Sequence, residues 1–372
     1  MNMIKEGKMK RNLILGVFIW ALFPWLPSTQ PTDAAEQTIT WRVLTPFAPR
    51  GWPQNMADTW AEDVEKMSGG RLKIEFDIGH ATGTPPDVLG RVAKGFHDAG
   101  YSSPVLEVQK YPAARLFSVL PAFTDLLGYY TWMYAWGGKD ALQDVYGTIV
   151  KALPAGMNWA RSGGWGNKPF ERVSDLKGTK HSSFNEPWKN ILSEAGASVE
   201  GVPFLFSVRR IGDGTLDAME STFVPWGVTP WQDMMLGVQK GAKYCYFPGL
   251  QRIGGFYALL VNNEKWNALP TDLKEIVRGA CDSAMVESLS KWIMDDVNSI
   301  KMLKEEGKTR PFKFTPELQQ EILDKYVAQY DAIQDPLFQK VWKSQKEFLK
   351  AYVPYMKLQQ VDAEVKLKEL PR

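Results

Sequence analysis

The alternation of apolar and polar residues predicts a mixed order of strands and helices in the first third of the chain. Residues 41–45, which include Trp41, Val43 and Leu44, are typical of a buried strand. Apolar residues then repeat every three or four positions over 53–67, which predicts a helix. Residues 71–77 alternate as a strand, and a helix over 86–95 and a strand over 99–103 follow. This order predicts a parallel sheet covered by helices.

The middle of the chain continues to mix the two periods, and the last third is helical. Further helices are expected at 124–150, 187–195 and about 207–214, and further strands at 153–159, 199–203, 243–247 and 255–261. Residues 272–306 keep a three-and-four spacing throughout, so one long helix is expected there. Thr315 and Asp335 each precede a proline, which predicts two more helix starts.

The first 35 residues have the pattern of an export signal. Four basic residues between positions 5 and 11 precede the apolar run Leu13–Phe23, and small residues follow, with cleavage expected near Ala34 or Ala35. A membrane-spanning helix is the alternative, but the apolar run is short and Pro24 interrupts its end. We therefore expect a periplasmic protein.

Composition narrows the possible functions. A length of 372 residues favours two lobes, and a net charge of +2 gives no electrostatic case for nucleic acid. Fifteen tryptophans can fill cores or wall a pocket. Cys245 and Cys281 have no spacing that demands a disulfide, so we expect two free thiols, at least one of them buried.

Motifs of catalysis are missing from the sequence. The three histidines, His80, His97 and His181, have no metal-ligand spacing. No serine lies in a Gly-x-Ser-x-Gly elbow, and there is no phosphate-binding loop. A binding protein is therefore favoured over an enzyme, and an exported hydrolase with an unrecognised triad is the alternative.

Residues 161–185 form the stretch on which a binding site is expected to depend. Gly163 and Gly164 permit a turn that side chains would block, and Lys168-Pro169 imposes an extended backbone. The result is a polar loop between two strands, which is a common place for a ligand pocket.

Several segments then show a family resemblance by their number and order. They are residues 60–74, Gly163-Gly164-Trp165 with Asn167-Lys168-Pro169, residues 175–178, 217–220, 246–249 and 259–262. In these segments the chain resembles the extracytoplasmic substrate-binding proteins of tripartite ATP-independent periplasmic (TRAP) transporters, of the DctP type.

The resemblance implies a two-lobed α/β protein with mostly parallel sheets, joined by crossing strands and a long spanning helix. The expected parts are a signal peptide at 1–35, lobe 1 at 36–160 plus about 254–310, lobe 2 at 161–253, and C-terminal helices at 311–372 that pack across the lobes. The ligand is expected between the lobes, and the membrane subunits of the transporter are the implied partner.

The sequence departs from the family pattern where the ligand should bind. The family's carboxylate-binding arginine aligns with Ser182, and the proline two positions later aligns with Phe184. Arg161 stands where a glutamine is common, and Arg252 stands where a glutamate can help to hold a metal ion. Glu220 matches an acidic position, but its usual tryptophan neighbour is Ser221, and about four residues are inserted within 222–229.

These departures suggest a relocated anion site. We expect no cofactor and no metal, because Arg252 would place a positive charge at the cation position. A small organic anion would be held through its carboxylate by Arg161 and Arg252. The other expected ligand-binding residues are Ser182, Ser102, Glu220, Ser221, Tyr101, Trp165, Phe223 and Trp226. The alternative for each arginine is a surface salt bridge or a structural contact, and His181 is expected to be packed or exposed rather than in contact with ligand.

Two uses of such a receptor remain open at this point. One is delivery of the anion to a TRAP transporter, with no chemistry performed. The other is a scavenging or sensory receptor of the same fold without a transporter. Neighbouring genes for membrane subunits would favour transport.

Overall fold

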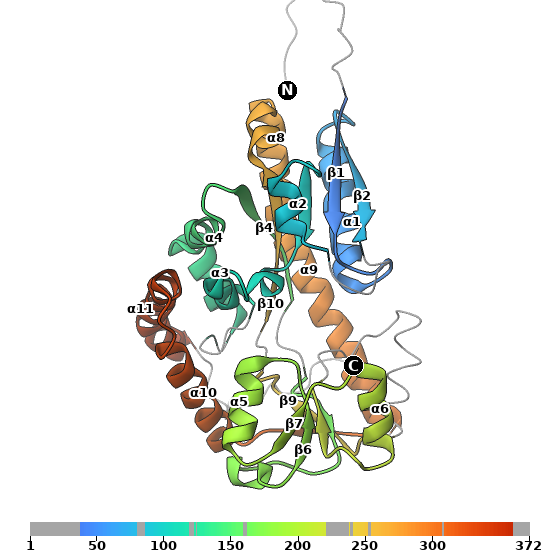
Figure 1. Ribbon diagram of the computed structural model, residues 1–372, viewed down its shortest axis with the longest axis vertical. Helices are drawn as coiled ribbons and strands as arrows, with labels where there is room; N and C mark the ends of the chain where they lie inside the picture. Colours follow the sequence, from blue (N-terminus) through green and yellow to red (C-terminus); the bar gives the residue numbers. More distant parts are fainter. Residues whose placement is uncertain are drawn as a thin grey trace, which may run out of the picture. The chain divides into compact units, whose positions relative to one another are not determined.

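The computed structural model describes residues 38–79, 86–118, 123, 125–158, 162–220, 238, 241–251, 254–306 and 309–359 (Figure 1). The expected signal peptide lies outside these residues. Within the described ranges, no helix is both long enough and apolar enough to cross a membrane.

The first sheet has five strands and contains the parallel unit predicted from the sequence. Its order is β2 (Leu72–Ile78), β1 (Ile39–Thr45), β3 (Ala99–Ser102), β10 (Gly255–Asn262) and β4 (Val150–Asn158). β2, β1, β3 and β4 point the same way, and β10 alone is antiparallel. β10 is therefore a strand from late in the chain that returns between β3 and β4.

The second sheet has six strands with the same design. Its order is β11 (Arg310–Lys313), β9 (Tyr244–Phe247), β5 (Trp165–Gly166), β8 (Ala218–Met219), β6 (Lys180–Ser182) and β7 (Ser198–Glu200). Only β5 runs against the other five strands. Both sheets are thus mostly parallel, as expected.

Helices surround both sheets and agree with most of the predicted ranges. Those between the strands are α1 (Trp52–Met67), α2 (Val88–Ala93), α3 (Leu126–Ala135), α4 (Gly138–Tyr146), α5 (Glu186–Glu194), α6 (Phe204–Gly212) and α8 (Asn263–Ala268). Short 3-10 turns occur at η2 (Pro104–Glu107), η3 (Pro112–Phe117) and η4 (Val173–Leu176). The helix expected over 124–150 is two helices, because Gly137 between them has a left-handed backbone with φ of 92°.

The long helix predicted over 272–306 is α9 (Thr271–Glu306). It packs against helix α1 and against strand β4 of the first sheet (Figure 1). It also contacts strand β11 of the second sheet. One continuous helix therefore contacts both sheets.

The last two helices begin at the predicted capping residues. The Thr315 hydroxyl accepts a hydrogen bond from the Leu318 amide at 3.1 Å at the start of α10 (Pro316–Asp331). The Asp335 carboxylate accepts one from the Phe338 amide at 2.6 Å at the start of α11 (Pro336–Gln359). Each cap satisfies an amide that the helix itself leaves unpaired.

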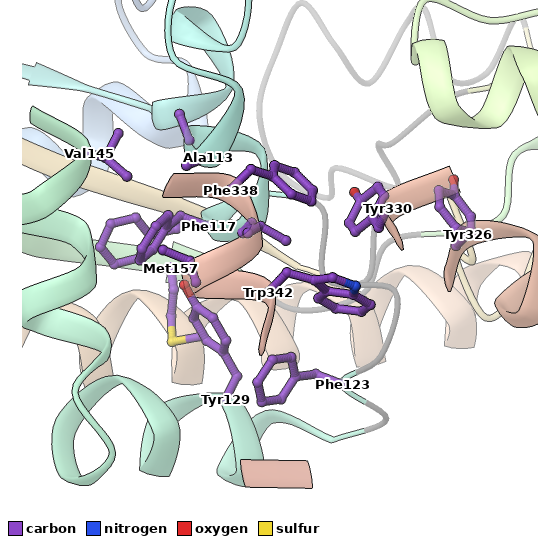
Figure 2. Packing of buried hydrophobic residues seen from close by; sticks show 14 of the residues in the cluster. Ala113, Phe117, Phe123, Tyr129, Val145, Met157, Tyr326, Tyr330, Phe338 and Trp342 are labelled. Atoms are coloured by element: carbon purple, nitrogen blue, oxygen red, sulfur yellow. The ribbon is translucent and has the colours of Figure 1, made fainter. Parts of the chain in front are cut away.

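Buried aromatic side chains of α10 and α11 join the elements around both sheets (Figure 2). The Trp342 ring lies edge-on to Tyr330 with centroids 5.4 Å apart, and its Nε1 donates to Asp331 at 2.7 Å. α10 contacts α5 beside the second sheet, whereas α11 contacts η3, α3 and α4 beside the first. The cluster includes Leu260 of the first sheet and Tyr246 of the second.

Both cysteines are buried and unpaired, as expected. Burial raises the pKa of the Cys245 thiol and of the Cys281 thiol, so both stay protonated at neutral pH.

Replacing Trp342 with alanine should lower the free energy of unfolding by about 3–5 kcal/mol, because Trp342 is fully buried and the change leaves a large cavity. Urea unfolding followed by circular dichroism measures the effect. Leu358→Ala is the control, since Leu358 is 84% exposed on the same helix and should change little. A loss below about 1 kcal/mol for Trp342→Ala would contradict this packing.

Candidate functional site at the carboxyl edge of the second sheet

The carboxyl ends of β6, β8 and β9 meet at one edge of the second sheet. Ser182 aligns with Met219 across β6 and β8, and Met219 aligns with Trp165 across β8 and β5. Because β5 is antiparallel, its amino end, with Gly163 and Gly164, lies at the same edge. Ligands of open α/β sheets usually bind outside the carboxyl ends of the strands. We therefore take this edge as the candidate site.

Two glycines shape the edge, as the sequence predicted. Gly164 has φ of 103°, and a Cβ there would lie 2.3 Å from the Met219 carbonyl oxygen. A Cβ on Gly163 would lie 2.7 Å from the Phe314 ring. The Gly163 amide donates to the Tyr246 carbonyl at 2.6 Å, which ties the loop to the end of β9. Side chains at these two positions are excluded by the close approach of neighbouring segments.

Glu220 directly follows β8 and belongs to a hydrogen-bonded group of polar residues. Its amide donates to the Ser182 carbonyl at 2.7 Å, and its Oε2 accepts a hydrogen bond from the Ser183 hydroxyl. The Ser183 hydroxyl in turn accepts from the Asn185 amide at 3.1 Å. These bonds hold the Glu220 carboxylate at the edge.

Gln251 extends this group to the segment after β9. Its carbonyl accepts a hydrogen bond from Asn185 Nδ2 at 2.8 Å, and its Nε2 donates to the Ser162 carbonyl at 2.9 Å. The side chain is fully buried, and its Oε1 has no hydrogen-bond partner among the described residues. Reasoning from the sequence missed Gln251. The only signal in the sequence was its position, directly before Arg252 and two residues after Gly249.

Ser182, expected from the resemblance to stand at the family's arginine position, already has hydrogen-bond partners on α6 and on the segment before it. Its hydroxyl donates to the Val202 carbonyl at 3.3 Å and accepts from the Ser207 hydroxyl at 2.9 Å. The residue is 4% exposed. The sequence shows that this position has a hydroxyl. It does not show that the hydroxyl donates its proton to a backbone carbonyl.

Trp165 and Tyr101 are fully buried. Trp165 packs with Ile211 and Leu303 on one face of the second sheet. Tyr101 lies in the first sheet, donates to the Ala155 carbonyl at 2.8 Å and stacks on Tyr257. Both side chains thus belong to the cores.

Ser102, at the carboxyl end of β3, is 1% exposed, and its hydroxyl has no partner among the residues described. The other expected ligand residues, Arg161, Ser221, Phe223, Trp226 and Arg252, lie outside the described residues. The structure therefore brings Ser182 and Glu220 together, and it places Tyr101 and Ser102 on the other sheet.

An ion pair fixes the start of β6 against β8. Lys168 Nζ lies 2.8 Å from one Asp217 oxygen, and the Lys180 amide donates to the other at 2.9 Å. Burial alone would raise the pKa of the Asp217 carboxyl, but the hydrogen bonds from Lys168 and Lys180 lower it overall. Asp217 is therefore a charged structural residue.

His181 is packed, as expected from the sequence, and borders a cavity of about 20 Å³ together with Glu220, Gly163 and Tyr246. Its Nε2 lies 2.8 Å from the Thr179 hydroxyl, and its ring packs on Phe170. Burial lowers the pKa of His181 to about 4, so the ring is neutral at pH 7.

The described residues contain no cluster of three or more His, Cys, Asp or Glu side chains that could hold a metal ion. Glu220 supplies one carboxylate at the edge, and one of its oxygens already accepts from Ser183. A calcium site needs six to eight oxygen ligands. The described residues of the edge therefore do not fit a metal site.

The model of the DctP family, bacterial extracellular solute-binding protein family 7, matches residues 49–336. The chain belongs to this family. The curated relative "Monocarboxylate 2-oxoacid-binding periplasmic protein" of Nostoc sp. is 28% identical over 346 residues, which is 91% of each chain.

Solved structures of TRAP solute-binding proteins share the fold. One from Colwellia psychrerythraea, with bound calcium and pyruvate, has a TM-score of 0.73 at 24% identity and covers 87% of this chain and 97% of its own. One from Bordetella bronchiseptica RB50, with copurified calcium and picolinate, has a TM-score of 0.72 at 20% identity and covers 87% and 95%. The expected two-lobed α/β fold is thereby confirmed for this DctP family member.

The neutral state of buried His181 predicts a loss of stability in acid. The unfolded chain binds a proton on this histidine below about pH 6.5, whereas the folded chain does so only near its pKa of about 4. The contribution of neutral His181 to the free energy of unfolding is full above about pH 6.5. It should fall by about 2 kcal/mol by about pH 5. Urea unfolding of wild type and of His181→Gln, each at about pH 6.5 and about pH 5, measures this loss of stability. An equal acid loss in the variant would contradict this assignment.

Proposed function

We propose that this DctP family protein is the periplasmic solute receptor of a TRAP transporter and that it binds a small organic acid through its carboxylate. The observation that carries the proposal is the convergence of polar groups at the carboxyl edge of the second sheet. Ser162, Ser183, Glu220 and Gln251 come from four separate segments, and hydrogen bonds among them and Asn185 link them there. Such convergence is typical of a ligand site.

The relatives support the ligand class. The Nostoc protein is named for monocarboxylate 2-oxoacids, and the Colwellia and Bordetella structures contain pyruvate and picolinate. All of these ligands carry a carboxylate. By similarity, we extend this class to the present chain.

We propose that Arg161 and Arg252 grip the carboxylate in place of the family's arginine. Ser182 has no positive charge, and its hydroxyl already bonds to Val202 and Ser207. The positive charge that binds the carboxylate must therefore come from other residues. Guanidinium groups form paired hydrogen bonds with carboxylates. Ser221, Phe223 and Trp226 remain proposed ligand contacts on the segment that follows Glu220.

We further propose that binding needs no metal and no cofactor. Calcium accompanies the ligand in both structures described above. By the resemblance, Arg252 stands where a glutamate of the family can help to hold a metal ion, and a guanidinium repels a cation.

The protein is proposed to perform no catalysis. Its part is to bind the acid between lobe 1 and lobe 2, with the proposed bounds given above, and closure of the lobes would be read by the membrane subunits. Export by residues 1–35 would place it in the periplasm. A scavenging or sensory receptor would bind in the same way, and co-purification with the membrane subunits distinguishes the two. A hydrolase would return a changed ligand.

Replacing Arg161 or Arg252 with alanine should weaken carboxylate binding by about 30-fold or more, because loss of one partner of a buried charge pair costs about 2–5 kcal/mol. Isothermal titration with pyruvate, or with the tightest acid found in a screen, measures the change. Arg278→Ala is the control, since Arg278 pairs with Glu275 on the surface of α9. Unchanged affinity in both arginine variants would overturn the relocated clamp.

Treatment with EDTA should leave the affinity for the same acid within about 2-fold, because the proposed clamp uses guanidinium groups alone. Titrations before and after chelation, and after addition of calcium, measure this. An affinity that falls about 10-fold on chelation and returns with calcium would show that a metal takes part.

A further inference from the structure

We propose that Gln251 is a positioning residue of the anion site: its side-chain amide holds together the two backbone segments that carry Arg161 and Arg252. This inference rests on the proposed function. It concerns a residue that neither the family resemblance nor the sequence singled out.

The contacts of Gln251 connect two distant segments. Its Nε2 donates to the Ser162 carbonyl at 2.9 Å, and this bond is buried and spans 89 positions of the sequence. Its own carbonyl accepts from Asn185 Nδ2 at 2.8 Å, which attaches it to the polar group around Glu220. Gln251 thus joins three of the four segments at the edge: its fully buried side chain binds the Ser162 segment, and its backbone carbonyl binds the Asn185 segment.

Chain connectivity relates this bond to the two arginines of the proposed clamp. Arg161 directly precedes Ser162, and Arg252 directly follows Gln251. Successive Cα atoms are about 3.8 Å apart, so each arginine is one residue from an end of the Ser162–Gln251 bond. The Ser162–Gln251 bond therefore joins the direct sequence neighbours of the two proposed carboxylate ligands, so its loss should reach the proposed clamp through the backbone.

The second polar atom of Gln251 supports the same role. Its Oε1 is buried and has no partner among the described residues. A buried acceptor without a donor is unfavourable, so such atoms usually have a functional explanation. Oε1 is thus an acceptor for an N–H donor of the proposed site, and each arginine carries five such donors.

Gln345 offers a matched control. It is also buried, with 1% of its surface exposed, and its Nε2 also donates to a backbone carbonyl, that of Leu116, at 3.0 Å. It lies on α11, against η3 of the first sheet. Gln251→Met and Gln345→Met therefore remove the same kind of hydrogen bond with little change in side-chain length.

The experiment measures melting temperature and dissociation constant for both variants. The wild type is titrated with pyruvate, lactate, picolinate and galacturonate, and the acid bound most tightly is the probe. Both variants should melt at lower temperature than wild type. Only Gln251→Met should weaken binding of the probe, by about 10-fold or more, while Gln345→Met stays within about 2-fold.

A double substitution tests whether Gln251 acts through the arginines. In an Arg161→Ala background, Gln251→Met should weaken binding by no more than about a further 2-fold, because the group that it positions is already gone. A full additional 10-fold loss would overturn the inference.

Two further outcomes would overturn the positioning role of Gln251. If Gln251→Met changes affinity by less than about 2-fold, or if both glutamine variants weaken binding equally, the positioning role is wrong while the carboxylate receptor stands. If none of the four acids binds to wild type, the ligand class falls and the inference falls with it.

Discussion

The burial of aromatic side chains between α10, α11 and the elements around both sheets is the interaction on which the architecture depends. Trp342, Tyr330 and Phe338 pack edge to face, and their cluster includes Leu260 of the first sheet and Tyr246 of the second. Tyr246 also contacts the candidate site, because its carbonyl accepts from Gly163. The packing that joins the sheets therefore also supports the loop at the edge where we place the ligand.

Strand direction explains why the site forms at this edge. β6, β8 and β9 end there, and the single antiparallel strand, β5, begins there. Ser183, Glu220 and Gln251 are distant in sequence, yet each follows the end of a strand. Hydrogen bonds among these residues and Asn185 hold the carboxylate of Glu220 in a fixed place. A rigid polar edge of this kind preorganises binding, and preorganisation reduces the entropy lost when a ligand is held.

The fold was largely predictable from local signals, and the site was not. Apolar spacing predicted α1 and α9, and a capping residue before proline predicted the starts of α10 and α11. A strand over 255–261 was predicted, but the antiparallel direction of β5 and β10 was not, because strand direction depends on pairing between distant segments. Gly163 and Gly164 were identified, since their need for space is local. The partners of Ser182, the burial of Trp165 and Tyr101, and the contacts of Gln251 depend on tertiary packing, which residue type alone does not reveal.

The central claim is that the protein is a receptor for small carboxylates, and a thermal-shift panel of the mature protein tests it most directly. The panel should contain carboxylates, keto acids, sugar acids and aromatic acids, each with its neutral amide or ester as a partner. An acid present at about 100 times its dissociation constant should add about 2.7 kcal/mol of stability, while its neutral partner adds little. Stabilisation by neutral compounds alone, or by none of the acids, would contradict the claim.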